Sequence, residues 1–377
     1  MKNKPRIRFK GFAEDWEQRK LSDVLRVNSG KDYKHLDQGN IPVYGTGGYM
    51  LSVNESLSNI DAIGIGRKGT IDKPQYLKAP FWTVDTLFYL TALGKYSILF
   101  LYYLMQLIPW KKFDESTGVP SLSKTTIDSI SAYVPSNSEE EESISALFNQ
   151  LDKSITLHQR KLEKLKLAKK ALLQKLFPKN GSQFPEIRFK GFTDAWEQRE
   201  LAELCNVYDG THQTPRYTNS GVMFVSVENI KTLESDKYIS EDDFKNEFKI
   251  FPEFGDILLT RIGDVGSANI ILDNIKRAYY VSLALLKPKG VNSLFLLALL
   301  SSASVQSEIW KRTLHIAFPK KINKNEISKV IVSKPSILEQ KKIGELIYAL
   351  DQIITLHQRK LDKLQEVKKG LLQKMFV

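Results

Sequence analysis

The sequence predicts an α+β protein in which two similar α/β domains are joined by two long antiparallel helices that form a coiled coil. Three observations predict this fold: a 17-residue segment that occurs twice, a 27-residue helical segment that occurs twice, and a strand-like stretch that recurs in diverged form. Self-similarity of this kind indicates a duplicated chain. We therefore expect each half to supply one domain and one helix, in a pseudo-twofold, circular arrangement.

Two pairs of segments carry the repeat. PRIRFKGFAEDWEQRKL (5–21) returns as PEIRFKGFTDAWEQREL (185–201), with 12 of 17 positions identical. LDKSITLHQRKLEKLKLAKKALLQKLF (151–177) matches LDQIITLHQRKLDKLQEVKKGLLQKMF (350–376) at 19 of 27 positions. The order along the chain is therefore domain, long helix, domain, long helix.

A weaker match lies inside the domains. The strand-like DAIGIGRKG (61–69) aligns with DILLTRIG (256–263), so Arg67 and Arg261 each stand two residues before a glycine. The remaining sequence between the repeats differs, which confines the variable parts to roughly 22–135 and 202–335. The predicted boundaries are 1–135 for the first domain, 136–180 for the first helix, 181–335 for the second domain and 336–377 for the second helix.

The repeated 27-residue segments have the pattern of coiled-coil helices, because apolar residues recur at alternating spacings of four and three. Ser136-x-x-Glu139 and Ser336-x-x-Glu339 predict a capping box at each helix start. A histidine on each seam is expected to fix register or to contact a partner chain, since a polar seam residue does so more often than it binds metal. The predicted seam and partner-contact residues are Leu151, Ile155, His158, Leu162 and Leu165 in the first helix, and Leu350, Ile354, His357, Leu361 and Leu364 in the second.

The composition is that of a globular protein with a basic surface. The 377 residues are 42% hydrophobic and 26% charged, and 55 Lys and Arg against 43 Asp and Glu give a formal charge of +12. This balance favours a polyanionic partner. The N-terminus lacks the apolar run of a secretory signal, and the apolar stretches 96–108 and 294–305 are too short to span a membrane, so we expect a cytoplasmic protein with buried helices there. Cys205, the single cysteine, is expected in the core.

Enzyme motifs are missing from the sequence. It contains no G-x-x-x-x-G-K-[ST], no H-E-x-x-H, no NPPY-like tetrapeptide and no His/Cys cluster with metal spacing. The glycine-rich run 45–48 lacks a following lysine that could bind phosphate, and it is expected to form a turn. We therefore expect neither a catalytic nor a metal site in this chain.

Several motifs together resemble one known family. They are the W-E-Q-R-x-L segments (16–21 and 196–201), EQKKI (339–343) and the L-x-Q-R-K-L helices. The sequence is similar to the specificity subunit of type I restriction-modification systems, and the resemblance covers essentially the whole chain. One departure is EEEESI (139–144), which stands where the second helix has LEQKKI.

The resemblance implies a non-catalytic subunit that reads a bipartite, asymmetric target in double-stranded DNA. It implies two methyltransferase subunits as partners, with restriction and translocase subunits reached through them. S-adenosylmethionine, ATP and Mg²⁺ would then be held by the partners and not by this chain. An antiparallel helix pair has a pseudo-twofold axis like the dyad of duplex DNA, which suits two unlike half-sites.

Polar and cationic residues in loops flanked by Gly, Pro or Ser are the candidates for DNA contact, since such side chains suit base edges and phosphates. Each also fits a solvated surface residue, and a structural salt bridge competes with the DNA role for both repeated arginines. Tyr44, Trp82 and Phe88 are expected in the core instead. The candidates are Arg67, Lys68, Ser123 and Lys124 in the first domain, and Gln213, Arg216, Arg261, Lys320, Lys321 and Asn323 in the second.

Two other functions stay open at the level of sequence. One is a structural adaptor that binds protein partners through its repeated domains and coiled coil, with its basic charge serving solubility alone. The other is a nuclease, which would need a carboxylate cluster that the sequence does not reveal. Salt-dependent binding to duplex DNA separates the first reading from the DNA-binding one.

Overall fold

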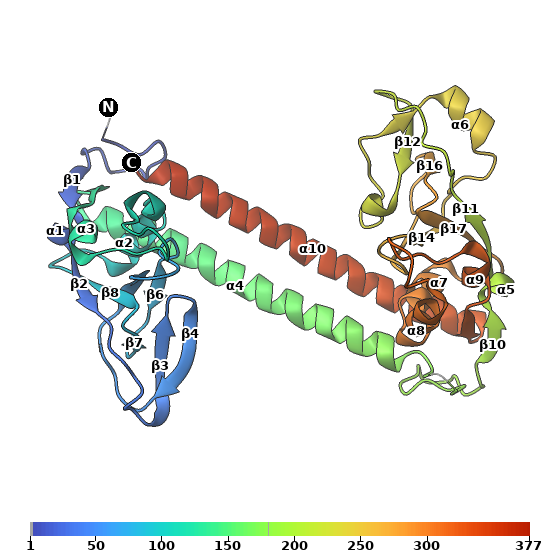
Figure 1. Ribbon diagram of the computed structural model, residues 1–377, viewed down its shortest axis with the longest axis horizontal. Helices are drawn as coiled ribbons and strands as arrows, with labels where there is room; N and C mark the ends of the chain where they lie inside the picture. The colour runs from blue at the N-terminus through green and yellow to red at the C-terminus, as the bar shows by residue number, and fades with distance from the viewer. Residues whose placement is uncertain (1–2, 180) are drawn as a thin grey trace. The chain divides into compact units, whose positions relative to one another are not determined.

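The computed structural model describes residues 3–179 and 181–377, and the chain divides into two compact units (Figure 1). The first unit contains residues 1–159 and 359–377, and the second contains residues 160–358. Each long helix is therefore shared, because its two halves belong to different units. Within one unit, the first half of one helix lies with the second half of the other.

The first unit is a mixture of short strands and helices. Its strands are β1 (Glu17–Lys20), β2 (Leu25–Ser29), β3 (Gln38–Gly45), β4 (Gly48–Val53), β5 (Ala62–Gly66), β6 (Gln75–Leu77), β7 (Trp82–Thr83), β8 (Leu87–Ala92) and β9 (Ser131–Val134). Its helices are α1 (Leu21–Val24), α2 (Ile98–Met105), the 3-10 turn η1 (Trp110–Phe113) and α3 (Lys124–Ser129), followed by the start of α4 (Ser138–Lys175).

The second unit has the same kinds of elements. Its strands are β10 (Glu197–Glu200), β11 (Cys205–Asp209), β12 (Val222–Val225), β13 (Tyr238–Ile239), β14 (Ile257–Thr260), β15 (Ala268–Ile270), β16 (Arg277–Tyr279), β17 (Leu283–Pro288) and β18 (Ile331–Lys334). Its helices are α5 (Leu201–Leu204), η2 (Val227–Asn229), α6 (Glu241–Glu247), α7 (Ser293–Leu300), α8 (Ala303–Arg312) and α9 (Lys324–Ser328), followed by α10 (Ile337–Met375).

Strand order is the same in both units. The four-stranded sheet runs β2-β8-β5-β6 in the first and β11-β17-β14-β15 in the second, and all neighbouring strands in these sheets are antiparallel. The three-stranded sheets also correspond, as β4-β3-β7 and β13-β12-β16, and each has one antiparallel and one parallel pair. The sequence similarity that fades between the repeats is thus retained as topology. The mixed helix and sheet content and the two-domain organisation confirm the predicted α+β class.

The two apolar stretches form buried helices, as predicted. Ser97 caps α2 by accepting the N–H of Phe100 at 3.3 Å, and Asn292 caps α7 by accepting the N–H of Phe295 at 2.9 Å. Both helices belong to the hydrophobic cores of their units. Among the described residues no single helix is long and apolar enough to cross a membrane, although the bent pair α7 and α8 meets that test by length and composition.

The predicted seams are protected faces of α4 and α10, because every seam side chain is buried or half-buried. In the first unit, Asp152 of α4 and Lys368 of α10 form an ion pair at 2.6 Å. The matching pair in the second unit joins Lys169 of α4 and Asp351 of α10 at 2.5 Å. These residues occupy equivalent repeat positions with the helices exchanged, as an antiparallel pair requires.

The repeated N-terminal segments close the ends of these helices. In the first unit Arg8 binds Glu140 at 2.6 Å, and Trp16 packs edge-on against Phe100 and Phe376 at the end of the chain. The backbone of Ile7 donates to the carbonyl of Lys374 at 2.9 Å.

The second unit repeats this junction with equivalent residues. Arg188 binds Glu339 at 2.8 Å, and Trp196 packs against Phe177 and Phe295. Both carboxylates are at most 1% exposed. The strong repetition of the 17-residue segment therefore has a structural reason, since it forms the joint between domain and helix.

The predicted capping boxes are wrong. Ser136 donates to Glu14 at 2.7 Å, and α4 begins two residues later, where the Asn137 side chain accepts the N–H of Glu139. Glu339 is bound to Arg188 and does not reach back to the helix start. The residue equivalent to Glu339 is Glu140 and not Glu139, because the spacing between the serine and this glutamate is one residue longer in the first copy.

The core position predicted for Cys205 is confirmed, and burial raises the pKa of its thiol to about 12.

Candidate nucleic-acid interface

In the first unit, Arg67 and Lys68 are presented at the end of a buried strand. Strand β5 is buried at all five positions, and both residues that follow it are exposed. The backbone N–H groups of Arg67 and Lys68 donate to the Thr86 carbonyl at 2.8 and 3.3 Å, while the Arg67 carbonyl accepts from Leu122 at 3.0 Å. Backbone hydrogen bonds therefore hold the turn from both sides. The two cationic side chains are not used in these bonds.

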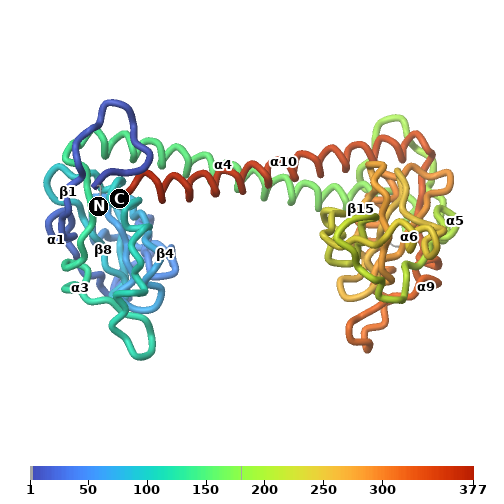
Figure 2. The backbone as a smooth tube through the Cα atoms, turned by 90° about the horizontal axis from the view of Figure 1, so that it is seen from above, coloured from blue at the N-terminus to red at the C-terminus, as the bar shows by residue number. Residues whose placement is uncertain are grey.

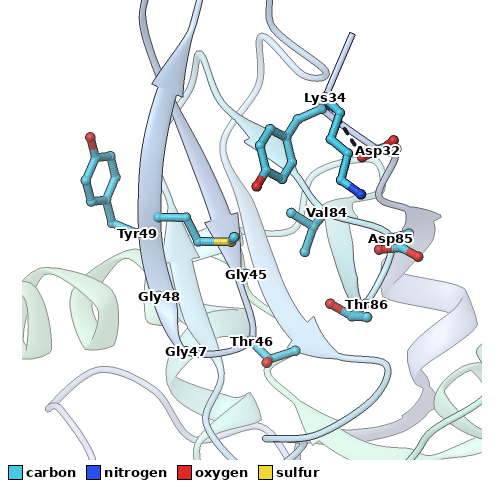
Figure 3. A pocket seen from close by; sticks show the side chains of 12 residues that line it. Asp32, Lys34, Gly45, Thr46, Gly47, Gly48, Tyr49, Val84, Asp85 and Thr86 are labelled. Carbon is cyan, nitrogen blue, oxygen red and sulfur yellow. Dashed lines mark hydrogen bonds between the residues drawn. The ribbon is translucent and has the colours of Figure 1, made fainter. Parts of the chain in front are cut away.

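An open cleft of about 720 Å³ lies beside this turn (Figure 3). Its walls come from the loop after β2, the β3–β4 turn and the segment before β8, and Thr86 lines it together with Lys34, Thr46 and Asp85. Gly69 is also close, because a Cβ built there would stand 3.6 Å from the Thr46 hydroxyl. The glycine run 45–48 is the turn that the sequence predicts, and it forms the lip of the cleft.

The loop that follows the first strand of each large sheet needs glycine in both units. A Cβ on Gly30 would approach the Val84 carbonyl oxygen to 1.9 Å, and one on Gly210 would approach the Tyr279 carbonyl oxygen to 2.5 Å. Only the absence of a side chain allows the strand end to lie this close to the neighbouring backbone. The loop beyond Gly210 carries Gln213 and Arg216, and both are exposed.

Arg261 occupies the backbone position of Arg67 but has a different environment. Its N–H donates to Ser282 and its carbonyl accepts from Ile322, which matches the bonds of Arg67. Its side chain, however, is 8% exposed, forms an ion pair with Asp209 and donates from Nε to the Ile322 carbonyl at 3.1 Å. Burial lowers the pKa of the Arg261 guanidinium. The salt bridge that competed with DNA contact in the sequence is therefore present in the structure.

The neighbours across the sheet explain the difference. Asp209 pairs in register with Ala284, whereas the equivalent strand of the first unit pairs Ser29 with Phe88. The small side chain of Ala284 leaves room for Arg261 to reach across the strand to the carboxylate of Asp209. In the first unit the guanidinium carbon lies 5.9 Å from the Phe88 ring centroid, and Ser29 offers no charge.

The remaining candidates lie at the starts of α3 and α9 or just ahead of them. Ser123 caps α3 by accepting the N–H of Thr126 at 3.1 Å, so its hydroxyl has a structural partner. Asn323 stands at the same cap position of α9, is exposed and makes no cap bond from its side chain. Lys124, Lys320 and Lys321 are exposed. The structure thus places Arg67, Lys68 and Lys124 around one turn, and Lys320, Lys321 and Asn323 around its equivalent.

The aromatic candidates are confirmed as core residues. Trp82 and Phe88 are buried, and Tyr44 packs against the cluster that contains Trp82. The sequence did not single out Asp85 and Tyr49, which line the cleft, nor Ile316 and Phe318, which are fully exposed. The run HIAFPKK (315–321), apolar residues beside lysines in a loop without strand or helix periodicity, was the available signal for the last two.

A family model for the type I restriction modification DNA specificity domain matches residues 13–167 and 193–366, most of the chain in two copies. The chain belongs to this family. It is a type I restriction-modification specificity subunit with two target-recognition domains, as the sequence resemblance indicated. The family is non-catalytic, and the described residues include no group of three or more His, Cys, Asp or Glu that could hold a metal ion.

Individual relatives agree with this assignment. The chain is 23% identical over 297 residues to the type I restriction enzyme MjaVIII specificity subunit of Methanocaldococcus jannaschii, covering 73% of this chain and 68% of the relative. The crystal structure of the type I restriction-modification S subunit from M. genitalium has the same fold, with a TM-score of 0.75, 16% identity and 99% of both chains covered. A structure concerned with complex assembly and conformational transition of the type I system matches with a TM-score of 0.51 and 15% identity, covering 96% of this chain and 97% of that one.

Proposed function

We propose that the two variable segments of this specificity subunit read the two unlike halves of a bipartite DNA target. Residues 1–135 and 181–335 would be the reading domains, and 136–180 and 336–377 the helical spacers. The observation that carries the proposal is the turn of exposed Arg67 and Lys68 beside an open cleft. Such cations suit guanine edges or phosphates, and Asp85 in the cleft suits the amino group of cytosine.

The partners of this chain are also proposed from its symmetry. We infer two methyltransferase subunits, one for each unit, with restriction and translocase subunits reached through them. Equivalent leucines, Leu157 on α4 and Leu356 on α10, are 65% and 66% exposed, one in each unit. Two equivalent apolar positions on the repeated helices suit two copies of one partner. S-adenosylmethionine, ATP and Mg²⁺ would be held by the partners, and the assembly would be cytoplasmic.

Direct binding tests the DNA-reading role. The chain, assembled with its methyltransferase subunits, should bind duplex DNA with an affinity that decreases steeply with salt, because neutralised phosphates release counterions. Cells that carry the assembly should show one bipartite methylated motif by single-molecule sequencing. Binding without salt dependence, together with a genome free of such a motif, would favour a structural adaptor instead.

The spacer role has its own test. Four residues inserted into each helix, between Leu165 and Lys169 and between Leu364 and Lys368, add about 6 Å of rise and about 40° of net rotation. One base pair adds about 3.4 Å and about 34°. We expect the gap between the half-sites to grow by one or two base pairs while the bases read stay the same. Methylation at the original spacing would show that the helices do not set the distance.

A further inference from the structure

The segment between α8 and α9 projects from the second unit as a narrow hairpin (Figure 2). Its base is closed by Leu314 and Lys321, whose backbones bond at 2.8 Å, and Lys320 accepts the N–H of Gly263 at 2.8 Å. The hairpin therefore stands on the same strand end that carries Arg261. The backbone bonds at the base fix the position of the hairpin, and the residues at its tip are not used for this.

Two large apolar side chains occupy the tip without cover. Ile316 is 98% exposed and Phe318 is 103% exposed, which is the full value for an extended residue. Isolated apolar residues are common on surfaces, but two such side chains at the end of a braced hairpin form a wedge. Trp310, itself 57% exposed, supports the base, since its ring centroid lies 4.1 Å from that of His315.

The charge around the wedge favours a polyanion over a protein partner. Between 310 and 324 the sequence holds five Lys or Arg and no Asp or Glu. Lys311 and Arg312 are paired with Glu308 of their own helix α8, and Arg312 also with Glu326 of α9. In the described part of the chain, no carboxylate lies within ion-pair distance of Lys320 or Lys321. The Lys320 ammonium lies 4.8 Å from the Trp310 ring centroid, beside the wedge.

The equivalent hairpin of the first unit lacks these features. It is closed by Glu115 and Ser121, and its acidic residues are used locally, since Asp114 accepts the N–H groups of Ser116 and Ser121. Its large apolar residue is Val119, 66% exposed. The wedge is thus a property of the second domain, although both domains share the hairpin.

We propose that Phe318 and Ile316 insert between stacked base pairs of the DNA half-site read by the second domain. Lys320 and Lys321 would hold the phosphates on either side. Apolar wedges of this kind unstack a base step and kink the duplex, which lets a protein select deformable steps that it does not read by hydrogen bonds. This inference rests on the proposed DNA-reading function and adds to it a position of indirect readout in one half-site.

The experiment uses the chain assembled with its methyltransferase subunits and duplexes that carry its mapped motif. 2-Aminopurine replaces one base at a time in each half-site, apart from the methylated adenine. We expect binding to raise the fluorescence at one step of the second half-site. Ile316→Ser with Phe318→Ser should abolish that rise and weaken specific binding about tenfold. Phe318→Leu, which keeps an apolar tip, should retain most of both effects.

Val119→Ala is the matched control in the first domain, and it should change neither the fluorescence nor the affinity. Unchanged fluorescence and affinity in the double serine variant would overturn the inference, as would wild-type binding with no unstacked step. A double variant that fails to assemble with the methyltransferase in the absence of DNA would show that the hairpin contacts protein instead. If the wild-type assembly showed no sequence-specific binding, the DNA-reading function itself would be refuted.

Discussion

The two units share strand order and backbone bonding, yet one arginine is a surface group in the first and a structural group in the second. Arg67 and Arg261 follow equivalent strands and make equivalent backbone hydrogen bonds. The outcome depends on a neighbour across the sheet, Phe88 in one unit and Ala284 in the other. An equivalent position in the repeat therefore fixes the backbone of the arginine. The residue opposite on the neighbouring strand decides whether the guanidinium group lies at the surface or forms a buried ion pair.

The two domain–helix junctions also place equivalent residues in different hydrogen-bonding environments. This difference gives the largest predicted effect on stability. Glu140 accepts from Arg8 and also from the Trp16 indole at 3.2 Å, whereas the Trp196 indole N–H has no partner in the described part of the second unit. Arg188→Met should therefore destabilise the second unit by about 3 to 5 kcal/mol, because it leaves a buried carboxylate without its main donor.

Hydrogen exchange resolved by unit measures this loss. Arg8→Met is the matched variant, and it should cost the first unit less, since Trp16 still donates to its carboxylate. Equal losses in both units would show that the tryptophan bond contributes nothing to the difference.

Replacing each arginine by glutamine tests the different roles of Arg67 and Arg261. Arg261→Gln should lower stability by about 2 kcal/mol, because Asp209 loses its partner while remaining partly solvated. Arg67→Gln should leave the denaturation midpoint unchanged and weaken specific DNA binding about tenfold. Denaturant unfolding and duplex titration of both variants give the comparison. A destabilised Arg67→Gln with normal affinity would reverse the assignment.

A pH effect confined to the first unit comes from Glu141, whose equivalent in the second unit is Gln340. Each accepts a helix-cap N–H, from Ser97 at 2.8 Å and from Asn292 at 3.0 Å. Burial raises the pKa of Glu141 to about 7, against the lowering effect of the Ser97 bond and of Lys95. The folded state thus holds a proton that the unfolded chain releases at the ordinary glutamate pKa.

The sign follows from proton linkage. Stability of the first unit should be highest below the ordinary pKa, decline by about 2 kcal/mol as the pH rises towards 7, and then level off. Glu141→Gln should remove the decline and leave the first unit more stable at pH 8. Thermal unfolding between pH 5 and 8 checks both, and a wild-type curve parallel to that of the variant would contradict the assigned pKa.

The sequence predicted what depends on periodicity and repetition. The seam spacing placed α4 and α10, and the duplicated segments anticipated two units with one strand order. It did not predict what depends on contacts between distant residues. The burial of Arg261 needs Asp209 and Ala284 on two other strands, and the second capping box failed because Glu339 is bound by Arg188, 151 residues away. The exposed wedge was not predicted either, although the lysines that follow HIAFP in the sequence were a signal for it.

The most direct test of independent reading by two domains is an exchange of residues 22–135 for those of another specificity subunit. The hybrid, expressed with its methyltransferase, would have its methylated motif mapped by single-molecule sequencing. We expect one half-site to change completely, while the other half-site and the spacing remain those of the parent. A change in both halves, or in neither, would contradict the account of two separate reading domains.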